Sequence, residues 1–183
     1  MADSRPIGVF DSGLGGLTVV KALRSLLPHE SIVYFGDTAR VPYGNKSQGL
    51  IQEYSKDITD FLIEYDSKMI VVACNTATAQ ALDSLKKHSS IPVIGVIKPG
   101  VAEAIKATRN NHVGIIGTIA TITSKAYEKE LNGMNKDIKT STQACPLLVP
   151  LVEEGWLDGD VAKSIVNHYI SPLNDNSIDT LIL

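Results

Sequence analysis

Residues 69–78 join an apolar strand directly to the start of a helix, and this junction restricts the possible folds more than any other stretch of the chain. The segment 69–73, MIVVA, has no charged residue and is rich in β-branched side chains. This pattern is typical of a strand buried on both faces of a parallel sheet. Asn75 or Thr76 can cap the following helix, which we expect over about 77–87.

A cysteine, Cys74, lies at this junction. The carboxyl end of a strand and the amino end of a helix form the place where open α/β sheets bind ligands. The helix dipole and free N–H groups favour a thiolate there, so we expect the pKa of Cys74 to lie below its usual value of about 8.5. The alternative is that Cys74 is a small buried apolar residue. The residue types around it leave both interpretations open.

The same alternation of strand and helix recurs along the chain, and repeated βα units predict parallel sheets. Segment 71–78 weakly resembles segment 114–121. We therefore predict an α/β fold of two similar parallel-sheet subdomains facing across a cleft, residues 1–97 and 98–183. The other strands are expected at 7–10, 32–35, 92–97, 113–116, 139–144 and 178–183, and the other helices at 17–27, 47–65, from 99, 121–131 and 158–169.

Composition argues against several classes of function. The net charge is −3 and no basic run is present, so nucleic acid is a poor candidate partner. No apolar run approaches the ~18 residues of a membrane helix, and residues 1–5 do not resemble a signal peptide. Two distant cysteines and four scattered histidines predict neither a disulfide framework nor a structural metal site. We expect a cytoplasmic enzyme domain.

The glycines of segment 13–16, GLGG, do not have the G-x-G-x-x-G spacing of a dinucleotide-binding loop. Asp11 just before them would also place a negative charge near a pyrophosphate. We therefore expect no dinucleotide cofactor.

Four stretches of the chain resemble, in order, motifs of the glutamate racemases, which belong to the cofactor-independent aspartate/glutamate racemase superfamily. They are IGVFDSGLGG at 7–16, FGDTARVPYG at 35–44, CNTAT at 74–78 and ACPLLVPLVEEG at 144–155. The resemblance implies interconversion of L- and D-glutamate by proton transfer from two cysteines, without cofactor or metal. It also implies a cytoplasmic enzyme that supplies D-glutamate for peptidoglycan, and we expect a homodimer at full length.

The family pattern contains one further segment, G-C-T-H-Y-P, which carries the second catalytic cysteine and a histidine. It follows a strand like 178–183, where this chain stops. A buried parallel strand also normally has a following helix to cover one face. We therefore expect a truncated chain, with a βα unit missing, that does not racemise glutamate at a useful rate.

The resemblance assigns roles within the matching motifs. Cys74 transfers a proton on one face of the substrate, Asp11 assists it, and Glu153 plays the equivalent part for the second cysteine. From residue type alone, Asp11 could be a helix cap and Glu153 a solvated acid, and we expect Cys145 to be structural. The expected substrate contacts are Asp11, Ser12, Tyr43, Gly44, Asn75 and Thr76, with Thr118 and Thr121 as weaker candidates because both could be helix caps.

Two alternatives stay open. A sister racemase acting on aspartate or a hydantoin would use the same chemistry, and the size of its pocket would distinguish it. A non-catalytic fragment could bind an amino acid without turning it over, and an assay of proton exchange would separate it from an enzyme.

Overall fold

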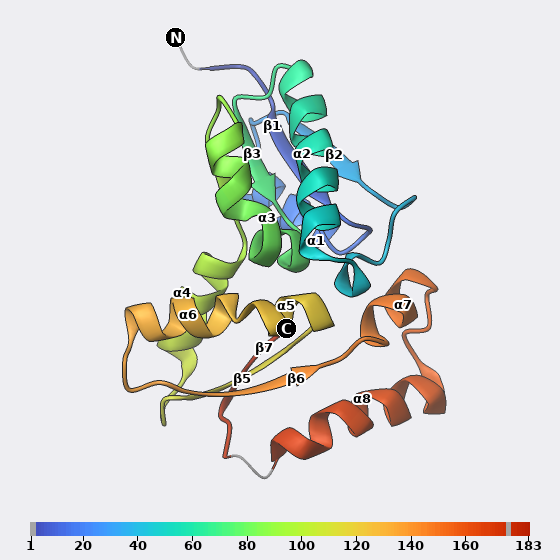
Figure 1. The fold of residues 1–183 in the computed structure, drawn as a ribbon, viewed down its shortest axis with the longest axis vertical. Helices are drawn as coiled ribbons and strands as arrows, with labels where there is room; N and C mark the ends of the chain where they lie inside the picture. Colours follow the sequence, from blue (N-terminus) through green and yellow to red (C-terminus); the bar gives the residue numbers. More distant parts are fainter. Residues whose placement is uncertain (1–2, 175–176) are drawn as a thin grey trace. The chain divides into compact units, whose positions relative to one another are not determined.

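A computed structural model describes residues 3–174 and 177–183 (Figure 1). The chain divides into two compact units between Val96 and Ile97. Both units are α/β with parallel sheets, so the fold class predicted from the alternation of strands and helices is confirmed.

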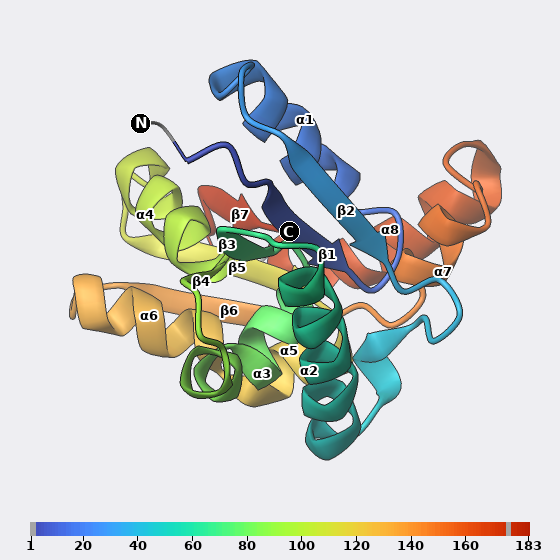
Figure 2. The same ribbon diagram turned by 90° about the horizontal axis from the view of Figure 1, so that it is seen from above.

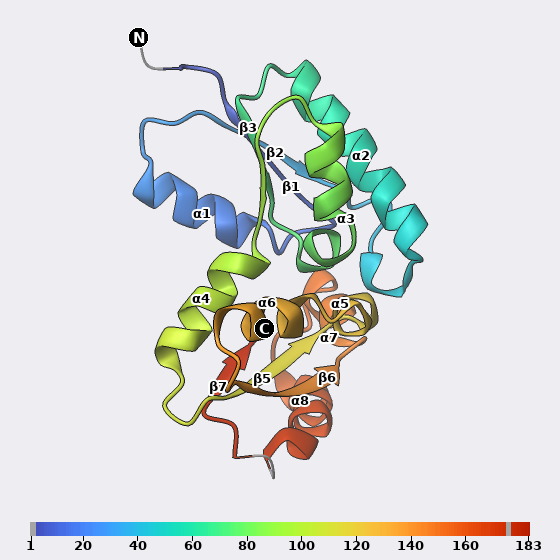
Figure 3. The same ribbon diagram turned by 60° about the vertical axis from the view of Figure 1, so that its left-hand side comes forward.

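The first unit has a four-stranded parallel sheet in the order β2-β1-β3-β4. Helix α1 covers one face of this sheet, and helices α2 and α3 cover the other (Figures 2 and 3). The strands are β1 (Ile7–Asp11), β2 (Ile32–Gly36), β3 (Met69–Val72) and β4 (Val93–Gly95), and the helices are α1 (Leu17–Leu26), the short 3-10 helix η1 (Tyr43–Asn45), α2 (Gln48–Glu64) and α3 (Asn75–His88).

Strand β3 is buried on both faces, as its uncharged sequence predicts. Val71 packs in a cluster with residues of β1 and α1. Ile70 and Val72 are fully buried, and they point to the opposite face because side chains alternate along a strand. Burial on both faces explains why this strand carries no polar side chain.

The register of the sheet brings the ends of β1, β2 and β3 to one edge. Phe10 lies beside Val72 of β3 and Phe35 of β2. The pairing continues beyond the strands, because the Ala73 N–H donates to the Phe10 carbonyl (2.8 Å) and the Asp37 N–H donates to the Asp11 carbonyl (2.9 Å). The residues that follow these three strands are therefore neighbours.

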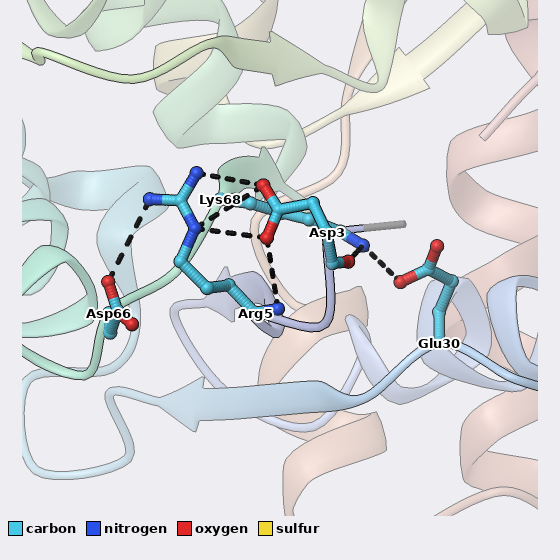
Figure 4. Close-up of polar contacts among 5 residues, drawn as sticks. All are labelled: Asp3, Arg5, Glu30, Asp66 and Lys68. Atoms are coloured by element: carbon cyan, nitrogen blue, oxygen red, sulfur yellow. Dashed lines mark hydrogen bonds and ion pairs between the residues drawn. The ribbon is translucent and has the colours of Figure 1, made fainter. Parts of the chain in front are cut away.

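The opposite edge of the same sheet carries a cluster of ion pairs (Figure 4). Arg5 contacts Asp3 at 2.8 Å and Asp66 at 3.8 Å, and Lys68 pairs with Glu30. Lys68 Nζ also donates to the Asp3 carbonyl (2.8 Å). These residues precede β1, β2 and β3, so they link the amino ends of the strands. The exposed pairs of Arg5 each contribute little stability.

The second unit has a three-stranded parallel sheet in the order β6-β5-β7. Helix α8 lies on one face of this sheet, and α4, α5 and α6 lie on the other (Figures 1 and 3). The strands are β5 (His112–Gly117), β6 (Lys139–Ala144) and β7 (Thr180–Ile182), and the helices are α4 (Ile97–Ala107), α5 (Ile119–Ser124), α6 (Ala126–Met134), α7 (Leu148–Glu153) and α8 (Gly159–Asn174).

Several predicted elements have other bounds in the structure, and two of these differences have a clear physical cause. The helix expected over 121–131 is divided into α5 and α6 at Lys125, which has φ of 56° in the left-handed region. The helix expected from Pro99 begins at Ile97. Proline fits the first turn of a helix because the N–H groups there have no intrahelical partner, so Pro99 does not mark the helix start.

Within residues 3–174 and 177–183, no helix has both the length and the apolar character required to cross a membrane.

Helix α2 contributes buried side chains to the core of the first unit, and substitution of Leu62 tests how much they stabilise it. Leu62 is 0% exposed, whereas Leu26 at the end of α1 is 77% exposed. We expect Leu62→Ala to lower the free energy of unfolding by about 3 kcal/mol, because it removes a buried side chain and leaves a cavity. We expect Leu26→Ala to change it by less than about 0.5 kcal/mol. Urea denaturation followed by circular dichroism would measure both, and equal effects would contradict this account of the core.

The second unit contains an aspartate, Asp179, whose contribution to stability should depend on pH. Asp179 accepts hydrogen bonds from Thr108 Oγ1 (2.7 Å) and from the backbone N–H groups of Arg109 (2.6 Å) and Asn110 (3.0 Å). These bonds lower the pKa of Asp179 from 3.8 to about 2, and the bond from Thr108 has the largest effect. Because the pKa is lower in the folded state, the stabilisation is present above about pH 4 and is lost as the pH falls toward 2.

We therefore expect Asp179→Asn to lower the melting temperature at pH 7 and to have little effect at pH 2. Calorimetry at both values would measure the difference, with Asp137→Asn as a control. An equal effect of Asp179→Asn at both pH values would show that its charge does not matter.

Candidate functional site

Cys74 lies between β3 and α3 and is itself the N-cap residue of α3. Its Sγ accepts a hydrogen bond from the Ala77 N–H (3.4 Å). The predicted caps, Asn75 and Thr76, are wrong, because both residues are already in the first turn of the helix. The sulfur takes the position that a Ser or Asp oxygen usually takes at a helix start.

The environment of the Cys74 thiol raises its pKa. Cys74 is 4% exposed, and its thiol donates a hydrogen bond to Ser12 Oγ (3.5 Å). Burial, followed by the negative charge of Asp11, raises the pKa of Cys74 to about 11, although hydrogen bonding with Ser12 and Ala77 acts in the opposite direction. The lowered pKa expected from the sequence is wrong, because desolvation of the thiolate outweighs the effect of the helix terminus.

Asp11 is the last residue of β1 and is held by the loop that follows. Its Oδ2 accepts hydrogen bonds from the backbone N–H groups of Gly13 (3.2 Å) and Gly16 (2.9 Å). The chain passes so close that a Cβ on Gly16 would lie 2.6 Å from Asp11 Cβ and 3.1 Å from Ala73 Cβ. The glycines that resemble a dinucleotide loop therefore position a buried carboxylate.

Tyr43 and Gly44 are buried in η1, which lies against α3. The Tyr43 hydroxyl donates to Asp37 Oδ2 at 2.5 Å. Burial, the bond to Asp37 and the charges of Asp37 and Cys74 raise the pKa of Tyr43 well above its ordinary value of 10. The phenol is therefore protonated, and Tyr43 lies close enough to Cys74 for a negative charge on the sulfur to oppose ionisation of the phenol.

The first unit thus brings several predicted site residues to one edge of its sheet. Cys74 is central, with Ser12 in contact with its sulfur and with Asp11 and Tyr43 near enough to alter the local electrostatics. Asn75 and the buried Thr76 follow it in α3. The gathered residues are Asp11, Ser12, Tyr43, Gly44, Cys74, Asn75 and Thr76.

The second unit carries the other predicted site residues. Thr118 caps α5, because its Oγ1 accepts from the Thr121 N–H (3.2 Å), and the two hydroxyl oxygens lie 2.9 Å apart. Glu153 is the last residue of α7 and is half-buried. Cys145 is buried and donates to the Gln143 carbonyl (3.5 Å). Burial raises the pKa of Cys145, and these contacts are those of a packed structural cysteine.

Asp37 and Arg40 lie in a matched motif, but the sequence analysis gave them no role. Asp37 is 4% exposed and forms an ion pair with Arg40 Nε at 2.8 Å. The signal in the sequence was a carboxylate placed directly after a strand, as Asp11 is placed at the end of β1. Among the described residues, no group of three or more His, Cys, Asp or Glu could hold a metal ion.

Comparison with known proteins identifies the family that this chain resembles. The family described as Asp/Glu/hydantoin racemase matches residues 17–183. The glutamate racemase of Geobacter metallireducens is 51% identical over 179 residues, which are 98% of this chain and 66% of that protein. The chain thus spans about two thirds of the length of this relative.

Solved structures of glutamate racemases are also similar over the whole chain. Isoform RacE1 of Bacillus anthracis has a TM-score of 0.95 and 44% identity, and the match covers 100% of this chain and 68% of that one. The enzyme of Francisella tularensis in complex with D-glutamate has a TM-score of 0.92 and 45% identity, with the same coverage. The chain therefore belongs to the Asp/Glu/hydantoin racemase family.

Proposed function

We propose that this chain is part of a cofactor-independent glutamate racemase, which interconverts L- and D-glutamate and so supplies D-glutamate for peptidoglycan. The observation that carries the proposal is the buried Cys74 thiol beside Asp11 at the start of α3. The family description also includes aspartate and hydantoin racemases. Glutamate is favoured because the Geobacter relative with 51% identity is a glutamate racemase, and the similar Francisella enzyme has been solved with D-glutamate.

In this proposal Cys74 exchanges a proton with the α-carbon on one face of glutamate. A thiol with a pKa of about 11 is ionised in only about one molecule in 10⁴ at pH 7. Its thiolate is correspondingly basic, which suits the removal of a weakly acidic proton. Asp11, held in place by Gly13 and Gly16, assists by facing the substrate ammonium.

The carboxylates of glutamate need hydrogen-bond donors. We propose that the Ser12 hydroxyl, the backbone N–H groups of Tyr43 and Gly44, and the side chains of Asn75 and Thr76 supply them. Thr118 and Thr121 are weaker candidates because Thr118 already caps α5. Glu153 assists the acid/base group on the opposite face.

Inversion requires a second acid/base group on the other face of the α-carbon. Of the two cysteines in the 183 residues, Cys145 is packed against the Gln143 carbonyl and is not assigned to this role. We also propose a cytoplasmic location, because both cysteines are unpaired and free thiols persist in reducing compartments. That the full-length protein is a homodimer is proposed from the family resemblance alone.

The 183-residue chain should therefore exchange the α-proton without inverting the carbon. We expect slow incorporation of deuterium into one enantiomer of glutamate in D₂O, followed by NMR, and no change in the circular dichroism of the glutamate solution. Cys74→Ala should abolish the exchange, whereas Cys145→Ala should keep it within about twofold. Steady inversion that is lost in Cys145→Ala would instead identify Cys145 as the second base.

The raised pKa of Cys74 predicts how its reactivity depends on pH. In the Cys145→Ala variant, alkylation of Cys74 by iodoacetamide should be slow at pH 7 and should rise about tenfold per pH unit up to at least pH 10, because the thiolate fraction rises in that proportion below the pKa. Saturating glutamate should slow it. Intact-protein mass spectrometry would follow the labelling, and a rate that levels off below pH 9 would contradict the raised pKa.

A further inference from the structure

Asp37 connects the end of β1 with η1, and residues at or next to both places are proposed to hold glutamate. Its backbone N–H donates to the Asp11 carbonyl (2.9 Å), and its side-chain Oδ2 accepts from the Tyr43 hydroxyl (2.5 Å). Gly36 just before it lies against the same loop, since a Cβ there would be 2.8 Å from the Gly13 carbonyl oxygen. Asp37 therefore contacts both the end of β1 and η1, and its neighbour Gly36 lies against the loop after β1.

Arg40 completes this connection and ties it to α2. Its Nε pairs with Asp37 Oδ2 (2.8 Å), and its Nη1 pairs with Asp57 Oδ2 (3.3 Å). The guanidinium carbon also lies 4.3 Å from the centre of the Tyr54 ring, and that ring packs at 5.9 Å from the ring of Tyr43. A stacked guanidinium that also pairs with carboxylates is held in one orientation.

The burial of Asp37 needs a physical reason. A carboxylate removed from water is costly unless charged and polar partners surround it. Both partners of Asp37, the Arg40 guanidinium and the Tyr43 hydroxyl, bind the same oxygen atom. This arrangement suits an anchor that holds its donors in place, and it does not suit a group that exchanges protons with a substrate.

We propose that Asp37 is a positioning residue that fixes η1 against the end of β1, and thereby sets the geometry with which Tyr43, Gly44 and the adjacent Ser12 receive glutamate. The anchoring of η1 is inferred from the contacts of Asp37 described above. Its effect on glutamate binding rests on the proposed function. Asp37 acts through Tyr43 and the Asp11 carbonyl and does not touch the reacting atoms.

Two variants test the anchor, and one serves as a matched control. Asp37→Asn keeps the size and the backbone bond but removes the charge, and Tyr43→Phe removes only the hydroxyl that Asp37 accepts. Asp57→Asn removes the charge of the second carboxylate that pairs with Arg40, and the side chain of Asp57 is 61% exposed. It leaves the contacts of Asp37 with Arg40 and Tyr43 in place. If Asp37→Asn does not fold, Tyr43→Phe still tests the positioning role, since it retains the ion pair between Asp37 and Arg40.

Hydrogen–deuterium exchange measures the anchor without any ligand. The Arg40 N–H donates to the Asp37 carbonyl (3.1 Å) and the Lys46 N–H donates to the Tyr43 carbonyl (3.0 Å). We expect Asp37→Asn and Tyr43→Phe to speed exchange at these two amides about tenfold and to leave the amides of β3 within twofold. Asp57→Asn should leave both sets unchanged. Equal acceleration in β3, or none at Arg40 and Lys46, would overturn the positioning role, because a general loss of stability would affect the whole sheet.

Binding of D- and L-glutamate by the unsubstituted chain and its variants, measured by calorimetry, tests the link to substrate. We expect Asp37→Asn and Tyr43→Phe to weaken binding about tenfold and Asp57→Asn to change it less than twofold. If exchange rises locally but the variants bind glutamate as tightly as the unsubstituted chain, the link is wrong. If the unsubstituted chain binds no glutamate while local exchange still rises, the proposed function fails and the anchoring of η1 stands.

Discussion

Parallel pairing of β1 with β2 and β3 determines where each group of the candidate site lies in the first unit. Their register leaves Asp11, Asp37 and Cys74 just beyond or at the end of three neighbouring strands, at one edge of the sheet. Backbone bonds from Ala73 to Phe10 and from Asp37 to Asp11 extend the pairing past the strands. A shift of register would separate these side chains even if every helix formed correctly.

Desolvation is the second constraint, and it acts differently on the two buried acids and the thiol. Asp37 has a guanidinium and a phenol hydroxyl as partners, and Asp11 has two backbone N–H groups. Cys74 has weaker sulfur bonds to Ser12 and Ala77, which do not compensate for burial beside the charge of Asp11. The thiol therefore stays protonated while the carboxylates have stronger partners.

The sequence predicted the features that follow from pattern. The burial of the uncharged run before Cys74 and the parallel sheets expected from the alternation of strands and helices rest on local periodicity and on the geometry of parallel sheets. The predicted cap of α3 was wrong because Cys74 itself takes that position. The predicted pKa of Cys74 was wrong because it depends on how deeply the sulfur is buried. The break at Lys125 was missed because one left-handed residue among helix-forming neighbours leaves no mark on hydrophobic periodicity. No role was predicted for Asp37, because its contacts with Tyr43 and Arg40 can be seen only in the folded loop after β2.

The charges of the first unit indicate what a bound substrate must supply. Arg40 offsets the charge of Asp37, whereas Asp11 is held by amide dipoles that carry no net charge. Ionisation of Cys74 would add a second negative charge beside Asp11, and like charges in a buried site oppose each other. An amino acid whose ammonium group lies near Asp11 would offset that charge and favour the thiolate. The same carboxylate that, after burial, raises the pKa of the thiol in the free protein would then attract the group that favours its ionisation, so that a larger fraction of Cys74 would be thiolate with such a substrate bound.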